Sequence, residues 1–188
     1  MRKLAVFNST TLDGYFTDPN GDISWAHAGS DDPEFKQFIA GNAQGGGTLV
    51  FGRITYEMMA SYWPTPLASK NDPMVAEGMN KLTKIVFSRT LQETPWSNTR
   101  LMKGDLAEEI RKLKQGPGEG MTILGSGSIV SQLTQAGLID EYQLLVCPIV
   151  LGKGRTMFDG IEKKTNLKLV NTRAFANGKV LLSYASMA

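Results

Sequence analysis

The chain has 188 residues, of which 41% are hydrophobic and 20% are charged, as is typical of a globular protein with one sizeable core. The formal net charge is only +2, and lysines and arginines are scattered without a basic run, so we expect no nucleic acid as partner. A single cysteine, Cys147, excludes an intrachain disulfide, and with the single histidine, His27, it forms no recognisable metal cluster or nucleophilic couple. The N-terminus lacks the apolar stretch of a signal peptide, and no apolar run is long enough to span a bilayer, so we expect a cytoplasmic protein with no metal and no membrane contact.

The first part of the chain predicts a strand, a long loop and a helix. Residues 4–7 form an almost continuous apolar run, which is typical of a central strand. The loop that follows is rich in turn-forming residues and closes at Trp25, so it either covers a ligand or is a surface loop pinned by that side chain. A capping residue, Pro33 and acidic residues at positions 30–34 predict the start of a helix, which would place Phe35 on its apolar face and end at the glycines of positions 45–47.

Three later apolar runs, at residues 48–51, 84–88 and 121–124, each predict a buried strand that ends in small, hydroxyl or cationic residues. These residues are Gly52, Arg53 and Thr55 after the first run, Ser88 and Arg89 at the end of the second, and Gly125, Ser126, Gly127 and Ser128 after the third. In open α/β sheets, ligands bind where the parallel strands end. Helix-start amides and arginine forks both suit phosphate groups, so the three strand ends predict a dinucleotide site. Two arginines beside hydroxyls favour the 2′-phosphate of NADPH.

Each of these signals also has a plainer explanation. The glycine loop is not a complete dinucleotide fingerprint, because Val130 stands where a third glycine is needed, and a Gly-x-Gly after a strand also occurs as a tight strand–helix turn. Arg53 could be a surface arginine near a helix start, although the helix dipole disfavours a cation there.

The remaining pattern predicts a single α/β domain over residues 1–188. Residues 61–79 are polar and broken by prolines, which indicates an irregular excursion. Residues 105–115 form an amphipathic helical pattern, a second helix follows the glycine loop and ends at Gly137, and residues 142–151 form a long apolar strand. Two strands at residues 167–175 and 180–187 are joined through Asn177 and Gly178, which is a strong hairpin signal. Strands that alternate with helices and then form a hairpin favour an α/β sheet with mixed edge strands.

Five motifs in this order and spacing resemble the dihydrofolate-reductase-like superfamily, in the branch similar to the C-terminal reductase domain of riboflavin biosynthesis. They are LDG at positions 12–14, LVFGRITYE at 49–57, KIVFSRTL at 84–91, ILGSGS at 123–128 and AGLIDEYQLLVCPIVLGKGRTMF at 136–158. The resemblance covers nearly the whole chain. It implies a three-layer α-β-α fold around a mixed, mostly parallel sheet of eight or nine strands with a C-terminal antiparallel hairpin. It also implies NADPH as hydride donor and a homodimer.

The resemblance also assigns cofactor contacts to individual residues. It implies that the phosphate motif is Gly52, Arg53 and Thr55, that Ser88 and Arg89 lie near the 2′-phosphate, and that Gly125, Ser126, Gly127 and Ser128 form the pyrophosphate loop. Asn8, Asp13 and Gly14 match the loop that closes over the nicotinamide. Folate reductases have two adjacent glycines in the last loop, joined by a cis peptide, whereas here Ser126 follows Gly125.

We therefore expect an NADPH-dependent reductase of a small heteroaromatic or carbonyl-type substrate, pterin-like or ribosylaminopyrimidine-like. Hydride transfer asks the protein mainly to position the reactants and to exclude water. The substrate-binding candidates, on the first-strand loop and the helices, are Asn8, Asp13, Trp25, Phe35 and Tyr56. Asp31 is the catalytic candidate, and the alternative is that it simply begins a helix with Asp32. Two other functions remain open: an NADP-binding module without catalysis, and a degenerate structural dimer of the same fold.

Overall fold

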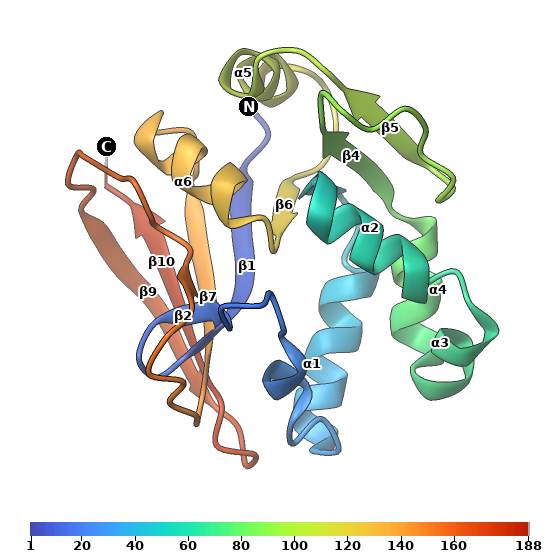
Figure 1. Cartoon of the computed structure of the whole chain (residues 1–188), viewed down its shortest axis with the longest axis vertical. Coiled ribbons are helices and arrows are strands. Elements are labelled where there is room, and N and C mark those ends of the chain that lie inside the picture. Colours follow the sequence, from blue (N-terminus) through green and yellow to red (C-terminus); the bar gives the residue numbers. More distant parts are fainter. Residues whose placement is uncertain (188) are drawn as a thin grey trace.

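The computed structural model describes residues 1–187, and its centre is an eight-stranded sheet (Figure 1). The strands of this sheet are β1 (Leu4–Thr11), β3 (Thr48–Gly52), β4 (Thr83–Phe87), β5 (Thr99–Met102), β6 (Met121–Leu124), β7 (Glu141–Cys147), β9 (Leu167–Ala174) and β10 (Val180–Ser186). They lie in the order β5-β4-β3-β6-β1-β7-β10-β9. The strands from β5 to β7 pair in parallel, and β10 joins β7 and β9 antiparallel. The expected mixed sheet with a C-terminal antiparallel hairpin is confirmed.

Helices cover both faces of the sheet. They are α1 (Pro33–Gln44), α2 (Arg53–Tyr62), α3 (Pro66–Asn71), α4 (Pro73–Lys81), α5 (Leu106–Gln115) and α6 (Gly127–Gln135). In β3, Val50 packs in the same cluster as Ile110 of α5 and Val130 of α6. Its neighbour Phe51 points to the opposite face and packs in the same cluster as Met79 of α4. Burial on both faces explains why the parallel strands are continuous apolar runs, and it produces the predicted three layers.

The start of α1 follows the predicted capping pattern. The carboxylate of Asp32 accepts a hydrogen bond from the backbone N–H of Phe35 at 3.0 Å, and Pro33 occupies the first helical turn. An aspartate cap satisfies an N–H group that has no partner inside the helix, and proline fits the first turn because it has no N–H to lose. The helix ends at Gln44, before the glycines expected to stop it.

Three boundaries differ from the sequence-based expectation. The first strand, expected over residues 4–7, continues to Thr11, so Asn8 lies in β1 and not in the loop after it. Residues 61–79 are not an irregular excursion, because α3 and α4 begin there at Pro66 and Pro73. Proline disrupts a helix interior but is accepted at its first position, so the prolines mark helix starts here. The strand expected at residues 142–151 ends at Cys147, before Pro148, which cannot donate to a ladder.

A second, two-stranded sheet joins β2 (Tyr15–Thr17) to β8 (Arg155–Thr156). It ties the loop after β1 to the loop after β7. The parallel register places the ends of the central strands at one edge, because Phe7 pairs with Leu124 and Gly52 with Phe87. The chain therefore leaves β1, β3, β4 and β6 at the same edge of the sheet, which we call the carboxyl edge.

Candidate functional site

Hydrogen bonds of Ser126 and Asn8 connect the ends of β1, β3 and β6 at the carboxyl edge. The backbone N–H of Gly52 donates to Ser126 Oγ at 2.7 Å, and both the backbone N–H and the hydroxyl of Ser126 donate to Thr55 Oγ1 at 3.0 Å. The side chain of Asn8 accepts from the N–H of Gly125 at 2.6 Å and donates to its carbonyl at 3.2 Å. The predicted residues of β1, β3 and β6 are therefore brought together, and their mutual geometry is fixed by hydrogen bonds.

The starts of α2 and α6 lie beside each other and carry no side-chain cap. Gly52 is the N-cap of α2 and Ser126 that of α6, and neither contributes a capping hydrogen bond. Side chains cap α1, α3 and α5, whereas α4 also lacks a side-chain cap. Within residues 1–187, no hydrogen-bond acceptor is found for the backbone N–H groups of Gly127 and Ser128. Two adjacent helix starts with free N–H groups present a positive end suited to an anion.

Close packing requires glycine at two positions of this loop. A Cβ on Gly125 would lie 2.7 Å from Thr55, and the backbone there has φ +59. A Cβ on Gly127 would lie 2.7 Å from the ring of Phe16. Ser126 itself adopts a left-handed conformation with φ 57 and ψ 60, and no peptide bond in the described chain is cis. The Gly-Ser-Gly sequence thus fits a turn in which backbone amides face outward.

Two arginines follow neighbouring strands at this edge. The Arg53 side chain is partly exposed and pairs with Glu57 one turn along α2, at 2.9 Å between Nη1 and Oε2. Arg89 is exposed and follows Ser88, whose hydroxyl oxygen accepts from the N–H groups of Thr90 and Leu91 at 3.2 and 2.9 Å. The Ser88 hydroxyl therefore shapes the turn that presents Arg89, and exposed guanidinium groups of this kind suit phosphate oxygens.

Asp13 joins the two loops that form the second sheet. Its carboxylate accepts from the N–H groups of Leu151 and Gly152, at 3.2 and 2.7 Å, and from the hydroxyl of Thr11 at 2.6 Å. The hydroxyl of Thr11 is the main cause that holds the pKa of Asp13 below its ordinary value. Gly14 follows with φ +86 and with open space where a Cβ would lie. Asp13 thus positions the loop expected to cover the nicotinamide.

The other substrate-binding candidates do not converge on one cavity. Phe35 is buried in a cluster with Leu145 and Phe175, whereas Tyr56 lies in a different cluster, where its hydroxyl accepts from the N–H of Trp96 at 3.2 Å. Trp25 lies in the short 3-10 helix Ser24–His27 and is partly buried.

Asp31, the catalytic candidate, lies at the surface. Its side chain is fully exposed and pairs with Lys36 at 3.3 Å. This position is not enclosed by apolar side chains, and the neighbouring Asp32 provides the helix cap.

The structure adds residues that sequence reasoning missed. Met157 Sδ accepts from Asn8 Nδ2 at 2.8 Å, and the ring of Phe16 covers Gly127. Lys179 follows the Asn-Gly hairpin turn and is 1% exposed. The hairpin signal at positions 177–178 predicts the turn that Lys179 follows. It does not predict that Lys179 contacts the first loop, because that contact joins residues far apart in sequence.

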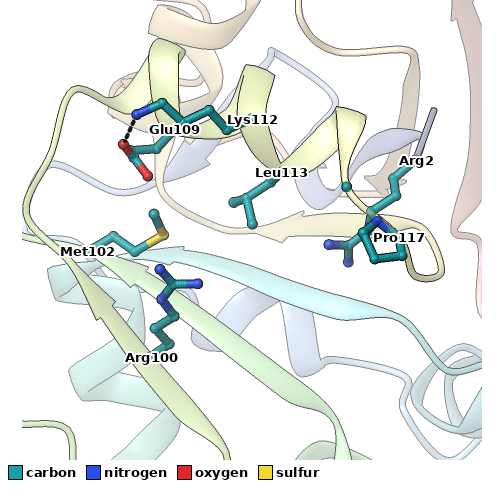
Figure 2. A pocket seen from close by; sticks show the side chains of 8 residues that line it. Arg2, Arg100, Met102, Glu109, Lys112, Leu113 and Pro117 are labelled. Carbon is teal, nitrogen blue, oxygen red and sulfur yellow. Dashed lines mark hydrogen bonds and ion pairs between the residues drawn. The ribbon is translucent and has the colours of Figure 1, made fainter.

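Shallow pockets lie away from the carboxyl edge. Figure 2 shows one of about 280 Å³ between β5 and α5, where Arg2 and Arg100 point into the opening and Glu109 is paired with Lys112 at 2.7 Å. Another of about 290 Å³ lies between α5 and α6. None of the predicted site residues lines either pocket. Among residues 1–187 there is no group of three or more His, Cys, Asp or Glu side chains placed to hold a metal ion, and no helix long and apolar enough to cross a membrane.

A mostly parallel sheet with helices on both faces and an antiparallel C-terminal hairpin defines an α/β protein, and this architecture is consistent with the dihydrofolate-reductase-like fold. A family model described as the RibD C-terminal domain matches residues 2–181, and the chain belongs to this reductase-like family. The family resemblance predicted from the five motifs is confirmed.

Relatives match over nearly their full length. The chain is 31% identical over 189 residues to the uncharacterized protein YyaP of Bacillus subtilis (strain 168), with 97% of this chain and 94% of that protein covered. It is 26% identical to YwjB of the same organism, over 93% and 92% of the two chains.

Two solved structures share the fold. The structure of a putative riboflavin biosynthesis protein from Shewanella sp. PV-4 has a TM-score of 0.74 at 24% identity, with 99% of both chains covered. That of a pyrimidine reductase-like protein from Corynebacterium diphtheriae has a TM-score of 0.64 at 13% identity, covering 100% of this chain and 92% of the other.

Proposed function

We propose that this protein is an NADPH-dependent reductase of a small heteroaromatic or carbonyl-type substrate, pterin-like or ribosylaminopyrimidine-like. One observation carries the proposal: two uncapped helix starts meet at the carboxyl edge, and the Gly127 and Ser128 N–H groups find no acceptor within the described chain. Free amides at paired helix starts are suited to a pyrophosphate. The family supports the reductase activity, and the names of its structural relatives support a riboflavin- or pyrimidine-type substrate.

The residues of this edge fit the parts of NADPH. The N–H groups of Gly127 and Ser128 would hold the pyrophosphate, and Arg53 would neutralise its charge. Arg89, at the end of the neighbouring strand, would pair with the 2′-phosphate. When bound, NADPH supplies the hydride. The protein's own contribution is to orient the two reactants through Asn8 and the loop held by Asp13, and to exclude water.

Cofactor binding by fluorescence tests this function. We expect NADPH to bind at least about tenfold more tightly than NADH, because a charge-assisted pair with a phosphate contributes roughly 1.5–3 kcal/mol. Arg89→Ala should weaken NADPH binding and leave NADH binding unchanged, whereas Arg53→Ala should weaken both. Lys70→Ala, at an exposed position on α3, is the control and should change neither.

Two outcomes would redirect the assignment. If neither cofactor binds, the reductase function is rejected and only the fold remains. If NADPH binds but no pterin or aminopyrimidine consumes it, the protein is an NADP-binding module without catalysis.

We also propose that two copies associate through the edge strand β9. This strand has one neighbour, β10, so the other side of its backbone is unpaired. Leu169 and Val170 on it are 50% and 64% exposed, and Leu167 is 37% exposed. An exposed, partly apolar edge strand favours pairing with another chain, and a second copy is the partner that the family resemblance implies.

A further inference from the structure

The cavity between β5 and α5 is separate from the candidate cofactor site (Figure 2). Its volume is about 280 Å³, close to the lower end of the range for ligand pockets, so it suits a small molecule. Met102 and Leu113 supply apolar surface, and Arg2 and Arg100 point into the opening. No residue of the candidate cofactor site lines this cavity.

The two arginines of the cavity carry charges that the protein does not neutralise. Glu109 is the one carboxylate among the lining residues, and its Oε1 pairs with Lys112 Nζ at 2.7 Å. Within residues 1–187, neither Arg2 nor Arg100 forms an ion pair. The cavity therefore keeps an excess of positive charge, which favours an anionic ligand.

Arg2 is held in a fixed orientation by two uncharged groups. Its Nε donates to the carbonyl of Glu119 at 2.6 Å, and its Nη2 donates to the hydroxyl of the buried Thr48 at 2.8 Å. No acceptor for its Nη1 is found in the described part of the chain. A guanidinium that is already oriented loses less rotamer freedom when it binds a ligand.

The neighbouring end of α5 does not explain the position of this guanidinium. The carboxyl end of a helix attracts cations, and the backbone N–H of Arg2 does donate to the carbonyl of Lys114 in α5 at 2.8 Å. The side chain, however, uses Nε and Nη2 on Glu119 and Thr48, which lie outside this helix. Nη1 therefore remains available to a ligand.

The strand order separates the two arginines by the length of a small molecule. Thr48, which holds Arg2, is the first residue of β3, and Arg100 lies on β5, with β4 between these strands. Neighbouring strands lie about 4.8 Å apart, so these two points of the sheet are about 10 Å apart. Figure 2 shows Leu113 between the two guanidinium groups. This arrangement favours a ligand with two separated acidic groups over a single inorganic ion.

We propose that this cavity is a second binding site, which takes an elongated organic dianion with an acidic group at each end and an apolar body. Arg2 binds one acidic group through Nη1, and Arg100 binds the other through its guanidinium fork. Leu113 and the buried Met102 contact the body between them. Carboxylates and phosphate monoesters share this chemistry. The site goes beyond the proposed reductase function and does not depend on it.

Calorimetric titration of the full chain at low salt tests the inference. The probes are terephthalate and 4-carboxyphenyl phosphate, which differ in one acidic group, and benzoate, with a single acidic group, is the control ligand. We expect at least one dianion to bind about fivefold or more tightly than benzoate, because benzoate lacks the second charge-assisted contact. Tighter binding of the phosphate ester would identify a phosphate end, and tighter binding of terephthalate would identify a dicarboxylate.

Arg100→Gln and a matched control variant separate the cavity from general charge effects. Arg100 is exposed and forms no ion pair in the described chain, so its substitution should preserve the fold and weaken binding of the better dianion about 3- to 10-fold. Arg111→Gln removes the same charge from an exposed position on α5 outside the cavity, and it should change this affinity less than about twofold. Equal losses in the two variants, or dianions that bind no more tightly than benzoate, would overturn the inference.

A second measurement locates the ligand in the unmodified protein. In protein labelled with ¹³C at the methionine methyl groups, the aromatic ring of the probe should shift the resonance of Met102, which lines the cavity. It should leave in place the resonance of Met157, which contacts Asn8 at the carboxyl edge. An unmoved Met102 resonance at saturating probe also overturns the inference. The titrations contain no NADPH, so failure of cofactor binding refutes the proposed function alone.

Discussion

At the scale of single residues, Gly125 and Gly137 show how one backbone conformation can serve different purposes. Both have a positive φ, of +59 and +65 respectively. At Gly137 there is open space where a Cβ would lie, whereas at Gly125 a Cβ would meet Thr55 at 2.7 Å. Gly137 therefore only relieves backbone strain, whereas Gly125 also allows the close approach of β6 to the start of α2.

This difference yields a paired prediction. Gly137→Ala should lower the free energy of unfolding by about 1–2 kcal/mol, the cost of a left-handed conformation, and leave NADPH binding unchanged. Gly125→Ala should cost more than this and weaken NADPH binding at least about tenfold, because it displaces Thr55 from Ser126. Chemical denaturation and cofactor fluorescence measure the two effects. Equal losses in both variants would show that the contact with Thr55 is unimportant.

At the scale of elements, Lys84 of β4 caps the end of α4 from inside the core. It has no exposed surface, and its Nζ donates to the carbonyls of Met79, Asn80 and Leu82 at 2.8, 3.2 and 2.6 Å. The same atom lies 4.4 Å from the centre of the Trp96 ring. The last carbonyls of a helix have no partner within it, so a buried lysine supplies the missing donors.

We predict that Lys84→Met destabilises the protein by about 2–4 kcal/mol, because buried carbonyls lose their donor. Lys81→Met, at an exposed position on the same helix, is the control and should change the free energy of unfolding by less than about 0.5 kcal/mol. Urea denaturation provides both values. A loss below about 1 kcal/mol for Lys84→Met would mean that the carbonyls find other donors.

The contribution of Lys84 should also depend on pH. Burial lowers its pKa from 10.5 to about 8 in the folded protein. Between these values the unfolded chain binds the lysine proton more fully than the folded chain, so the free energy of unfolding gains a positive slope with pH. The wild-type protein should therefore gain stability relative to Lys84→Met as pH rises from 8 towards 10.5. If the free energy of unfolding instead fell with pH over this range, the carbonyls and Trp96 would be stabilising the charged ammonium.

The sequence predicted those elements whose signals are local. Apolar runs located β3, β4 and β6, and the Asp32–Pro33 pattern located the start of α1. The prolines of α3 and α4 were misinterpreted as breakers, since a proline at the first helical position and one in a loop look alike in sequence. The short strands β2, β5 and β8 were missed, because two to four residues show too little alternation.

The candidate site could be predicted only where its residues follow strands. Gly52, Thr55 and Ser126 were predicted because parallel strand ends must share an edge, and the structure joins them by hydrogen bonds. The position of Tyr56 could not be predicted, since the face of a helix that a core covers depends on tertiary packing. Asp31 precedes the cap of α1, and its exposure depends on how the first loop packs. The contact between Lys179 and Ala26 could not be predicted because it joins residues that are far apart in sequence.

At the scale of the whole molecule, the proposed dimer can be tested through β9. Leu169→Lys should convert a dimer to a monomer, because a charge on the exposed edge opposes pairing with a second strand. Leu67→Lys, at another exposed leucine on α3, should leave the mass unchanged. Size-exclusion chromatography with light scattering measures the molecular mass of each variant in solution. A wild-type protein that is monomeric at all concentrations would exclude association through this edge.

The tip of the β9–β10 hairpin has a consequence for the order in which the protein is built during translation. The strands that form the carboxyl edge, through β7, are synthesised before β9 and β10, and proteins emerge from the ribosome N-terminus first. The hydrogen bonds from Asn177 and Lys179 to Gly29 and Ala26 of the first loop can form only after nearly the whole chain has emerged. A nascent chain can therefore assemble its glycine loop early, while the segment around Trp25 is fastened at the very end of synthesis.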